Sequence, residues 1–246
     1  MDNELELTKK RLAELARRAE KRGEAAYSDF LTPAAQAEAA RMQSASLLCF
    51  DGGFDGAERR CAVFLPYEGC EWESRAACLE IAPANAKFAE ALTHRDYLGA
   101  LMGLGVRRET MGDIIVRGKT AWLFCLEGVA DYIAAQLEEV RRTSVRVKRA
   151  DPASAEPPEP PAESLVNVQS ARLDALVSAV YHLSRAESQR LFERELVLVN
   201  SLPARSPGAS AREGDAVSVR GHGRFVFCGV EGETRKGRLR ARVRIY

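Results

Sequence analysis

Histidine is scarce in this sequence, and no two of its cysteines are closely spaced. The 246 residues contain three histidines and six cysteines, and none of the cysteines forms a CxxC pair. Structural zinc sites usually take their ligands from such pairs. We therefore expect no metal site and no bound cofactor, and we expect reduced thiols that are mostly buried.

Long hydrophobic runs are also absent. No apolar stretch approaches the roughly 20 residues that a membrane helix needs, and the first 23 residues are charged and periodic, unlike a signal peptide. With 46% hydrophobic and 29% charged residues, the chain suits a soluble protein of two or three domains. The sequence thus predicts a cytoplasmic protein without a membrane partner.

Enzyme motifs are incomplete. The glycine-rich "DGGFDG" at 51–56 joins two predicted strands and no helix follows it, so it lacks the setting of a methyltransferase cofactor loop. His94 begins the string "HRD", but the glycine-rich loop and the metal-binding partners of a kinase are missing. We expect no enzymatic activity, no catalytic residue and no small-molecule substrate.

Proline and charge, in contrast, are unevenly distributed. Residues 150–164, "ADPASAEPPEPPAES", hold five of the ten prolines and four acidic residues, a composition typical of an extended linker. Residues 165–246 contain 14 Lys/Arg against 8 Asp/Glu, a net charge of +6, whereas the segments upstream of the linker are close to neutral. Positive charge gathered at one end is expected of a module that binds a polyanion.

These features divide the chain into four parts. They are an N-terminal helical and hairpin domain (1–73), an α/β domain (74–150), the proline-rich acidic linker (151–164) and a basic C-terminal domain (165–246).

The segment 1–73 is predicted to combine helices with a hairpin. An amphipathic helix ends at Gly23, and Thr32 caps a second helix that has Pro33 at its first position. Two apolar runs, 46–50 and 60–67, flank a turn rich in glycine and aspartate. We expect these runs to pair as a β-hairpin.

The segment 74–150 is predicted to alternate strands with helices. Its apolar patterns give the order β-α-β-β-α-β, which is that of a ferredoxin-like plait. The expected elements are strands at 75–83, 112–118, 120–127 and 144–150, and helices at 86–105 and 129–140.

Many plaits of this kind bind RNA through aromatic side chains on their two central strands. Here the first strand has no aromatic residue, and Trp122 and Phe124 on the third strand share a face. We expect this pair to pack under a helix, which leaves RNA binding by the domain open. The predicted helix 86–105 would place Phe88 and Leu101 in its apolar face.

The segment 165–246 is predicted to combine two short helices with strands. Ser184 and Glu187 form a capping box at the start of the second helix. In the tail, apolar residues alternate with arginines, and positions 234–246 contain no acidic residue. We therefore expect a row of unpaired guanidinium groups, suited to phosphate, formed by Arg238, Arg240, Arg242 and Arg244.

The string "RLDALVS…LSRAESQRLFERELVLVN…GDAVSVRG" resembles the S-four RNA-binding domain, also called the αL motif. Two positions depart from the pattern, because that family often has glycine where Glu195 and Ser201 stand. If Glu195 takes a left-handed backbone, the conformation costs about 1 kcal/mol.

Two further strings, "HRDYLGALMGLGVRRETMGDIIV" and "GRF…GETRKGRLRARV", are similar to the YlmH family of bacterial proteins. The resemblance implies an α+β protein with an N-terminal helical and hairpin segment, a central ferredoxin-like (RRM-like) plait and a C-terminal S-four domain. It also implies an RNA-binding factor whose partners are the large ribosomal subunit, rRNA and tRNA, acting in ribosome-associated quality control.

Carried over by position, the resemblance implies RNA-facing residues on both helices and at one strand end: Arg172, Ser184, Arg185, Ser188, Gln189, Arg190 and Asn200. The charge pattern of the tail adds Thr234, Arg235, Lys236 and Arg238.

Two alternatives stay open. One is an RNA-modifying enzyme: Asp174 in "RLD" superficially resembles the catalytic motif of a pseudouridine synthase, although no synthase body surrounds it. The other is a cell-division scaffold that makes protein contacts through residues 1–150.

Overall fold

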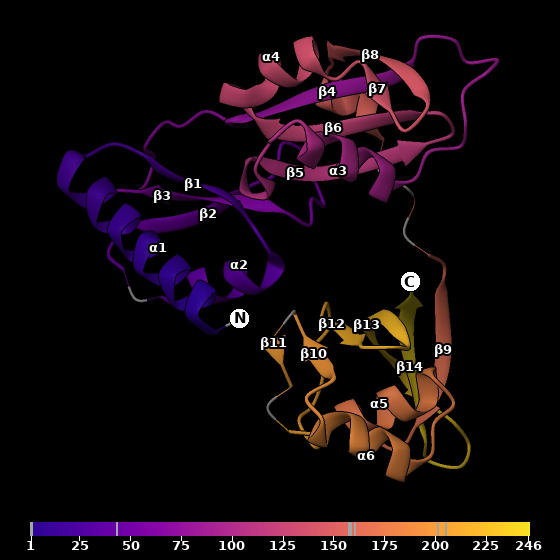
Figure 1. The fold of residues 1–246 in the computed structure, drawn as a ribbon. Coiled ribbons are helices and arrows are strands. Elements are labelled where there is room, and N and C mark those ends of the chain that lie inside the picture. Colours follow the sequence, from indigo (N-terminus) through magenta and orange to yellow (C-terminus); the bar gives the residue numbers. More distant parts are fainter. Residues whose placement is uncertain (1, 43, 157–158, 160, 201, 205) are drawn as a thin grey trace. The chain divides into compact units, whose positions relative to one another are not determined.

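The computed structural model describes every residue except 1, 43, 157–158, 160, 201 and 205, and the chain divides into two compact units, Met1–Pro158 and Glu159–Tyr246 (Figure 1). Both units mix helices with sheets, which confirms the α+β class. Among the described residues, no helix is long and apolar enough to cross a membrane. Within the same residues, no three His, Cys, Asp or Glu side chains gather as potential metal ligands.

The first part of unit 1 is a three-stranded antiparallel sheet packed against two helices. As predicted, Gly23 ends the first helix with a φ of 68°, and Thr32 Oγ1 accepts a hydrogen bond from the backbone N–H of Ala35 at the start of the second. The strand order is β1-β3-β2, so the predicted hairpin is present and the sequence missed the strand before it. The elements are α1 (Asp2–Arg22), β1 (Ala26–Leu31), α2 (Pro33–Ala39), β2 (Leu47–Asp51) and β3 (Arg60–Leu65).

The second part of unit 1 is a five-stranded antiparallel sheet in the order β5-β6-β4-β8-β7. Two helices cover one face of it, where Tyr97, Leu101, Leu123 and Ile133 are fully buried. The elements are β4 (Ala76–Pro83), α3 (His94–Gly103), η1 (Arg108–Thr110), β5 (Met111–Arg117), β6 (Thr120–Leu126), α4 (Glu127–Gln136), β7 (Glu139–Val140), β8 (Thr143–Arg149) and η2 (Pro152–Ala155).

The helix predicted over 86–105 is wrong in its first half. α3 begins only at His94, because the Asp96 carboxylate accepts hydrogen bonds from both the backbone N–H and the hydroxyl of Thr93. Upstream of this cap the chain is a loop, and Phe88, expected in the core, is 76% exposed. The helical spacing of apolar residues therefore extends upstream of His94, although the chain is not helical there.

Trp122 and Phe124 share a face of β6 as predicted, but no α-helix of the described chain covers that face. Phe54, from the loop between β2 and β3, lies against Phe124 with ring centroids 4.4 Å apart. Ala155 of η2 also packs there and is fully buried. The loop and the chain after β8 thus close the sheet face that α3 and α4 leave uncovered.

A polar contact joins the two parts of unit 1. The Asp113 carboxylate on β5 accepts hydrogen bonds from the backbone N–H groups of Glu58 and Arg59, at 2.6 and 3.1 Å. Burial raises the pKa of this carboxyl. Beside it, the Phe30 ring lies so close to Gly112 that a Cβ there would be 2.7 Å from it, so the joint requires glycine at this position.

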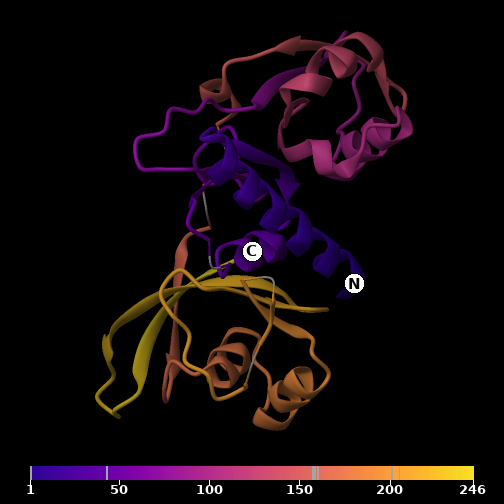
Figure 2. The ribbon, with the colours of Figure 1, turned by 90° about the vertical axis from the view of Figure 1, so that its left-hand side faces the viewer.

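Unit 2 is a six-stranded sheet in the order β11-β10-β12-β13-β14-β9, with the two helices on one of its faces (Figure 2). β13 and β14 form a long hairpin that projects beyond the other strands (Figure 2). The elements are β9 (Glu163–Val168), α5 (Leu173–Val180), α6 (Arg185–Glu193), β10 (Val197–Val199), β11 (Leu202–Pro203), β12 (Ala216–Val219), β13 (Gly223–Glu233) and β14 (Leu239–Ile245).

The predicted linker 151–164 is ordered at both of its described ends. Pro152–Ala155 forms η2 and packs on the sheet of unit 1. Glu163 is the first residue of β9, which pairs with β14 along its whole length. The proline-rich centre of the segment includes residues 157–158 and 160, which lie outside the described residues.

Candidate nucleic-acid interface

The start of α6 is held by the predicted capping box. The Ser184 hydroxyl accepts a hydrogen bond from the backbone N–H of Glu187 at 3.2 Å, and the Glu187 carboxylate accepts one from the backbone N–H of Ser184 at 2.8 Å. The side chain and the backbone N–H of Ser184 both lower the pKa of the Glu187 carboxyl by hydrogen bonding. The cap places Arg185 in the first turn, beside the partly positive end of the helix.

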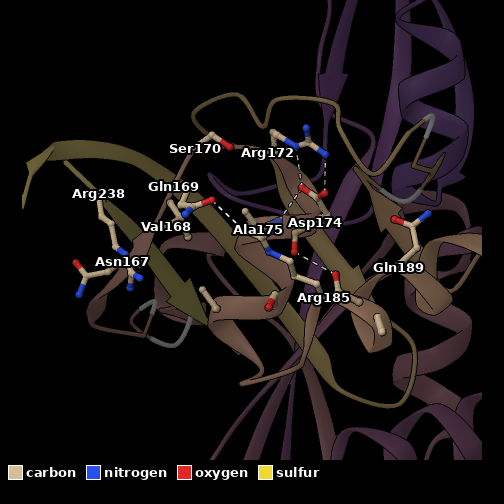
Figure 3. Close-up of a pocket in the computed structure, with 14 residues that line it drawn as sticks. Asn167, Val168, Gln169, Ser170, Arg172, Asp174, Ala175, Arg185, Gln189 and Arg238 are labelled. Atoms are coloured by element: carbon tan, nitrogen blue, oxygen red, sulfur yellow. Dashed lines mark hydrogen bonds and ion pairs between the residues drawn. The ribbon is translucent and has the colours of Figure 1, made fainter. Parts of the chain in front are cut away.

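A hollow of about 760 Å³ lies between the two helices, the end of β9 and the turn of the β13–β14 hairpin (Figure 3). Most of its lining side chains can form hydrogen bonds, and three of them are arginines. The lining residues include Gln169, Arg172, Asp174, Arg185, Ser188, Gln189 and Arg238.

Arg172 precedes α5 and is paired with a carboxylate. Its guanidinium donates from Nε and Nη2 to the two oxygens of Asp174, at 3.1 and 2.7 Å. The pair raises the pKa of Arg172 and lowers that of Asp174. A guanidinium held on one edge by a carboxylate keeps its other N–H groups for a ligand.

Arg185, Gln189 and Arg190 are exposed on α6. Arg185 donates from Nη2 to Gln169 Oε1 at 2.8 Å, a neutral partner that leaves the positive charge unmatched. For Gln189 and Arg190, the described residues provide no side-chain hydrogen bond or ion pair. These three side chains are therefore available to a ligand on the helix surface.

Ser188 was predicted to face RNA, but its side chain is buried. It is only 1% exposed, and its hydroxyl donates to the backbone carbonyl of Asp174 at 3.1 Å. This bond joins α6 to α5, so Ser188 supports the hollow from inside and does not present a free hydroxyl to a ligand.

Asn200 also has a local role. Its backbone is left-handed, with a φ of 49°. Its side-chain amide donates to Asp215 Oδ1 at 2.8 Å and accepts from the backbone N–H of Ala216 at 3.0 Å. The amide thus joins the end of β10 to the start of β12, and its bonds are directed into the protein.

The turn of the β13–β14 hairpin carries the other predicted residues. The Thr234 hydroxyl accepts from the backbone N–H of Arg238 at 3.0 Å, which closes the turn. Arg235, Lys236 and Arg238 are exposed, and no carboxylate of the described chain forms an ion pair with them. Arg238 lines the hollow, so the hairpin turn contributes positive charge to it.

The predicted row of unpaired arginines on β14 is wrong for three of its four members. Arg240 pairs with Glu231 at 3.0 Å, and Glu163 pairs with Arg242 at 3.3 Å and with Arg244 at 2.8 Å. The acids come from the adjacent strands β13 and β9, which antiparallel pairing brings beside β14. The lack of acidic residues within the tail therefore did not indicate whether its arginines form ion pairs.

The strand β9 contributes residues to the hollow that were not predicted from the sequence. Asn167 and Gln169, at the end of this strand and just beyond it, line the hollow. Their segment lies next to the proline-rich run and was not predicted as a strand. The alternation in "SLVNV" was the available signal, since Val166 and Val168 face the core.

Comparison with known proteins decides the family. "Ribosome-associated protein quality control protein P2" of Bacillus subtilis (strain 168) is 34% identical over 219 residues, which cover 87% of this chain and 84% of that protein. The chain belongs to the YlmH family. A family model described as "Putative RNA-binding domain in YlmH" matches residues 75–154.

A solved structure shares the fold of part of this YlmH-family chain. It is "Cell division protein ylmH from Streptococcus pneumoniae", with a TM-score of 0.50 and 21% identity, covering 60% of this chain and 91% of that one. The matched family model spans β4 to η2 and does not include the hollow of unit 2.

Proposed function

We propose that this YlmH-family protein binds RNA and acts on the ribosome in the bacterial cytoplasm, contacting large-subunit rRNA and tRNA in ribosome-associated quality control. It acts by occupying its site and carries out no chemical reaction. The name of the Bacillus subtilis relative and the description of the matched family model support the ribosome and RNA parts of this proposal.

The observation that carries the proposal is the basic surface of unit 2. Arg172, Arg185 and Arg238 converge on one hollow from three different elements, and a single carboxylate, Asp174, lies among them. A guanidinium binds phosphate oxygens through two parallel N–H bonds and also stacks on bases. A concave surface with this charge fits a folded RNA backbone, since phosphate contacts dominate such affinity.

We infer that unit 2 is an S-four-type domain. Two short helices, a capping box between them and a strand that follows match the pattern that the sequence resembles. The strand order and the helix positions of residues 76–149 likewise support a ferredoxin-like plait. Residues 1–73 would then be a separate N-terminal element joined to that plait through Asp113.

The test removes two charges from α6. Arg185→Ala combined with Arg190→Ala should weaken binding of the full-length protein to 23S rRNA fragments by at least tenfold, since charge-assisted bonds contribute about 1.5–3 kcal/mol each. The slope of log affinity against log salt concentration should also become shallower, because fewer counterions are released.

The matched control is Arg212→Ala combined with Arg220→Ala. Both residues are exposed in unit 2 and lie outside α6, and their replacement removes the same number of charges. This control should keep most of the affinity. Equal losses in the two double variants would mean that net charge, and not the arginines of α6, determines binding.

Sucrose-gradient sedimentation of lysates tests the ribosome part. The wild-type protein should sediment with large subunits at low salt, and the α6 variant should remain at the top of the gradient. Wild-type protein that stays at the top would contradict a ribosomal role. Mass analysis of RNA from cells with and without the gene would show a missing modification if the protein were an enzyme.

A further inference from the structure

The sheet face through which many plaits bind RNA is covered around Phe124 in this protein. Phe124 is fully buried under Phe54 and Ala155, and a Cβ at Gly53 would meet the Phe124 ring at 2.7 Å. A base therefore cannot stack on Phe124 unless the loop between β2 and β3 moves away. RNA that contacts this part of the chain needs another surface.

Phe88 supplies an aromatic side chain outside that covered face. It lies in the β4–α3 loop, residues 84–93, which projects from unit 1 (Figure 1). With 76% of its surface accessible, it is the most exposed of the large hydrophobic residues described. An exposed phenyl ring loses contact with water when it stacks on a base, which favours such a contact.

The loop is held in place along its length. Asn85 Oδ1 accepts from the backbone N–H of Lys87 at 3.1 Å, and the Lys119 ammonium donates to the carbonyl of Ala86 at 2.7 Å. At the other end, the backbone N–H of Glu90 donates to Thr143 Oγ1 at 3.4 Å. A ring on an anchored loop loses little conformational freedom when it binds a ligand.

The charge around Phe88 is positive. The Lys87 ammonium lies 5.7 Å from the centre of the Phe88 ring, and Lys119 is anchored two residues away at Ala86. Among the described residues, no carboxylate forms an ion pair with either lysine, and Glu90 is the one acidic residue of the loop. A phenyl ring beside unpaired ammonium groups suits a base and its flanking phosphates.

We propose that the β4–α3 loop is a second RNA contact, in which Phe88 stacks on an unpaired base while Lys87 and Lys119 contact the adjacent phosphates. The ligand class, RNA, rests on the proposed function. The contact requires a single-stranded segment, since bases within a duplex do not expose their faces.

The test compares Phe88→Ala with Tyr67→Ala in the full-length protein. Tyr67 is also a strongly exposed aromatic residue, at 58%, but its loop is acidic. Fluorescence anisotropy measures binding to a labelled oligouridylate and to a blunt RNA duplex of the same length. Phe88→Ala should weaken oligouridylate binding by about 5- to 150-fold, the equivalent of 1–3 kcal/mol for one stacked base, and leave duplex binding unchanged.

Two further variants sharpen the result. Phe88→Trp should retain the affinity, and its fluorescence should be quenched by oligouridylate beyond the change seen in the wild type. Lys87→Ala should reduce the slope of log affinity against log salt concentration by about 0.7, the value for one phosphate contact to a single strand.

Several outcomes would overturn the proposal. Unchanged oligouridylate affinity in Phe88→Ala removes the ring from any RNA contact. Equal losses in Phe88→Ala and Tyr67→Ala indicate non-specific adhesion. Loss of ribosome co-sedimentation in Phe88→Ala with unchanged RNA affinity indicates a protein partner instead.

The double variant of Arg185 and Arg190 separates this proposal from the function assigned to unit 2. If that variant binds rRNA normally while Phe88→Ala loses oligouridylate binding, the site in unit 2 fails and the loop contact stands. If only the Arg185/Arg190 variant loses binding, the loop contact fails and the site in unit 2 stands.

Discussion

Glu195 occupies a backbone conformation that favours glycine, and replacing it should stabilise unit 2. α6 ends in a Schellman motif: the N–H of Leu196 donates to the carbonyl of Leu191, and the N–H of Glu195 donates to the carbonyl of Phe192, both at 2.9 Å. Glu195 is the left-handed residue of this motif, with a φ of 53°. The cost anticipated from the sequence is therefore present in the structure.

The magnitude follows from two opposing effects. A residue with a Cβ in the left-handed region costs roughly 1–2 kcal/mol, and glycine adds about 0.4–1 kcal/mol of entropy to the unfolded chain. The Glu195 side chain is exposed and forms no ion pair with the described residues, so its removal breaks no contact there. Glu195→Gly should thus stabilise unit 2 by about 0.5–1 kcal/mol.

The assay must report unit 2 separately. Both tryptophans, Trp72 and Trp122, are in unit 1, so tryptophan fluorescence follows that unit and should not change. Native-state hydrogen exchange of the core amides of unit 2 measures the gain, and thermal unfolding of this unit should shift upward by about 2–8 °C. Glu195→Ala is the control, because it removes the same charge and keeps the Cβ. Equal stability of the two variants would refute the argument from backbone strain.

Two further predictions concern packing and pH. Gly112→Ala should destabilise unit 1 by about 1–3 kcal/mol in denaturant unfolding followed by tryptophan fluorescence, because the buried Phe30 ring lies 2.7 Å from the added Cβ. The same change at Gly99, where an added Cβ would meet no described atom within 4 Å beyond the adjacent helix backbone, should not destabilise it. Asp174→Asn should cost stability at neutral pH, because Arg172 holds the pKa of the Asp174 carboxyl below its usual 3.8. The difference in stability between this variant and the wild type should disappear as the pH falls through that lowered pKa. A difference that does not depend on pH would contradict the ion pair.

Features determined by neighbouring residues could be read from the sequence. The capping box of Ser184 and the cap at Thr32 each depend on a few adjacent residues, and each is present. The hairpins of unit 1 were recognised for the same reason. The left-handed backbone at Glu195, which the resemblance to the S-four family raised, is present too. The missed strand Ala26–Leu31 gave a weaker signal, because its apolar and polar residues do not alternate regularly.

Features that depend on distant partners could not be read in this way. The paired arginines of β14 show the reason, since Glu163 lies 79 residues from Arg242 and 81 from Arg244. Composition placed Glu163 in a linker, and its proximity to β14 follows only from the pairing of β9. The exposure of Phe88 was missed for another reason: the apolar spacing continues upstream of the local cap at Thr93, where the helix begins.

The ion pairs on β14 concentrate the charge of unit 2. The net +6 of residues 165–246 counts three arginines whose charge Glu163 and Glu231 offset locally. Arg185 and Arg190 on α6 and the basic residues of the β13–β14 turn have no acidic partner among the described residues. Arg185 and Arg238 of this set line the hollow. Because ion pairs attract a polyanion less than free guanidinium groups do, the α6 side of the unit should dominate RNA steering. The ion-paired arginines of β14 carry the same formal charge but should contribute little to RNA steering.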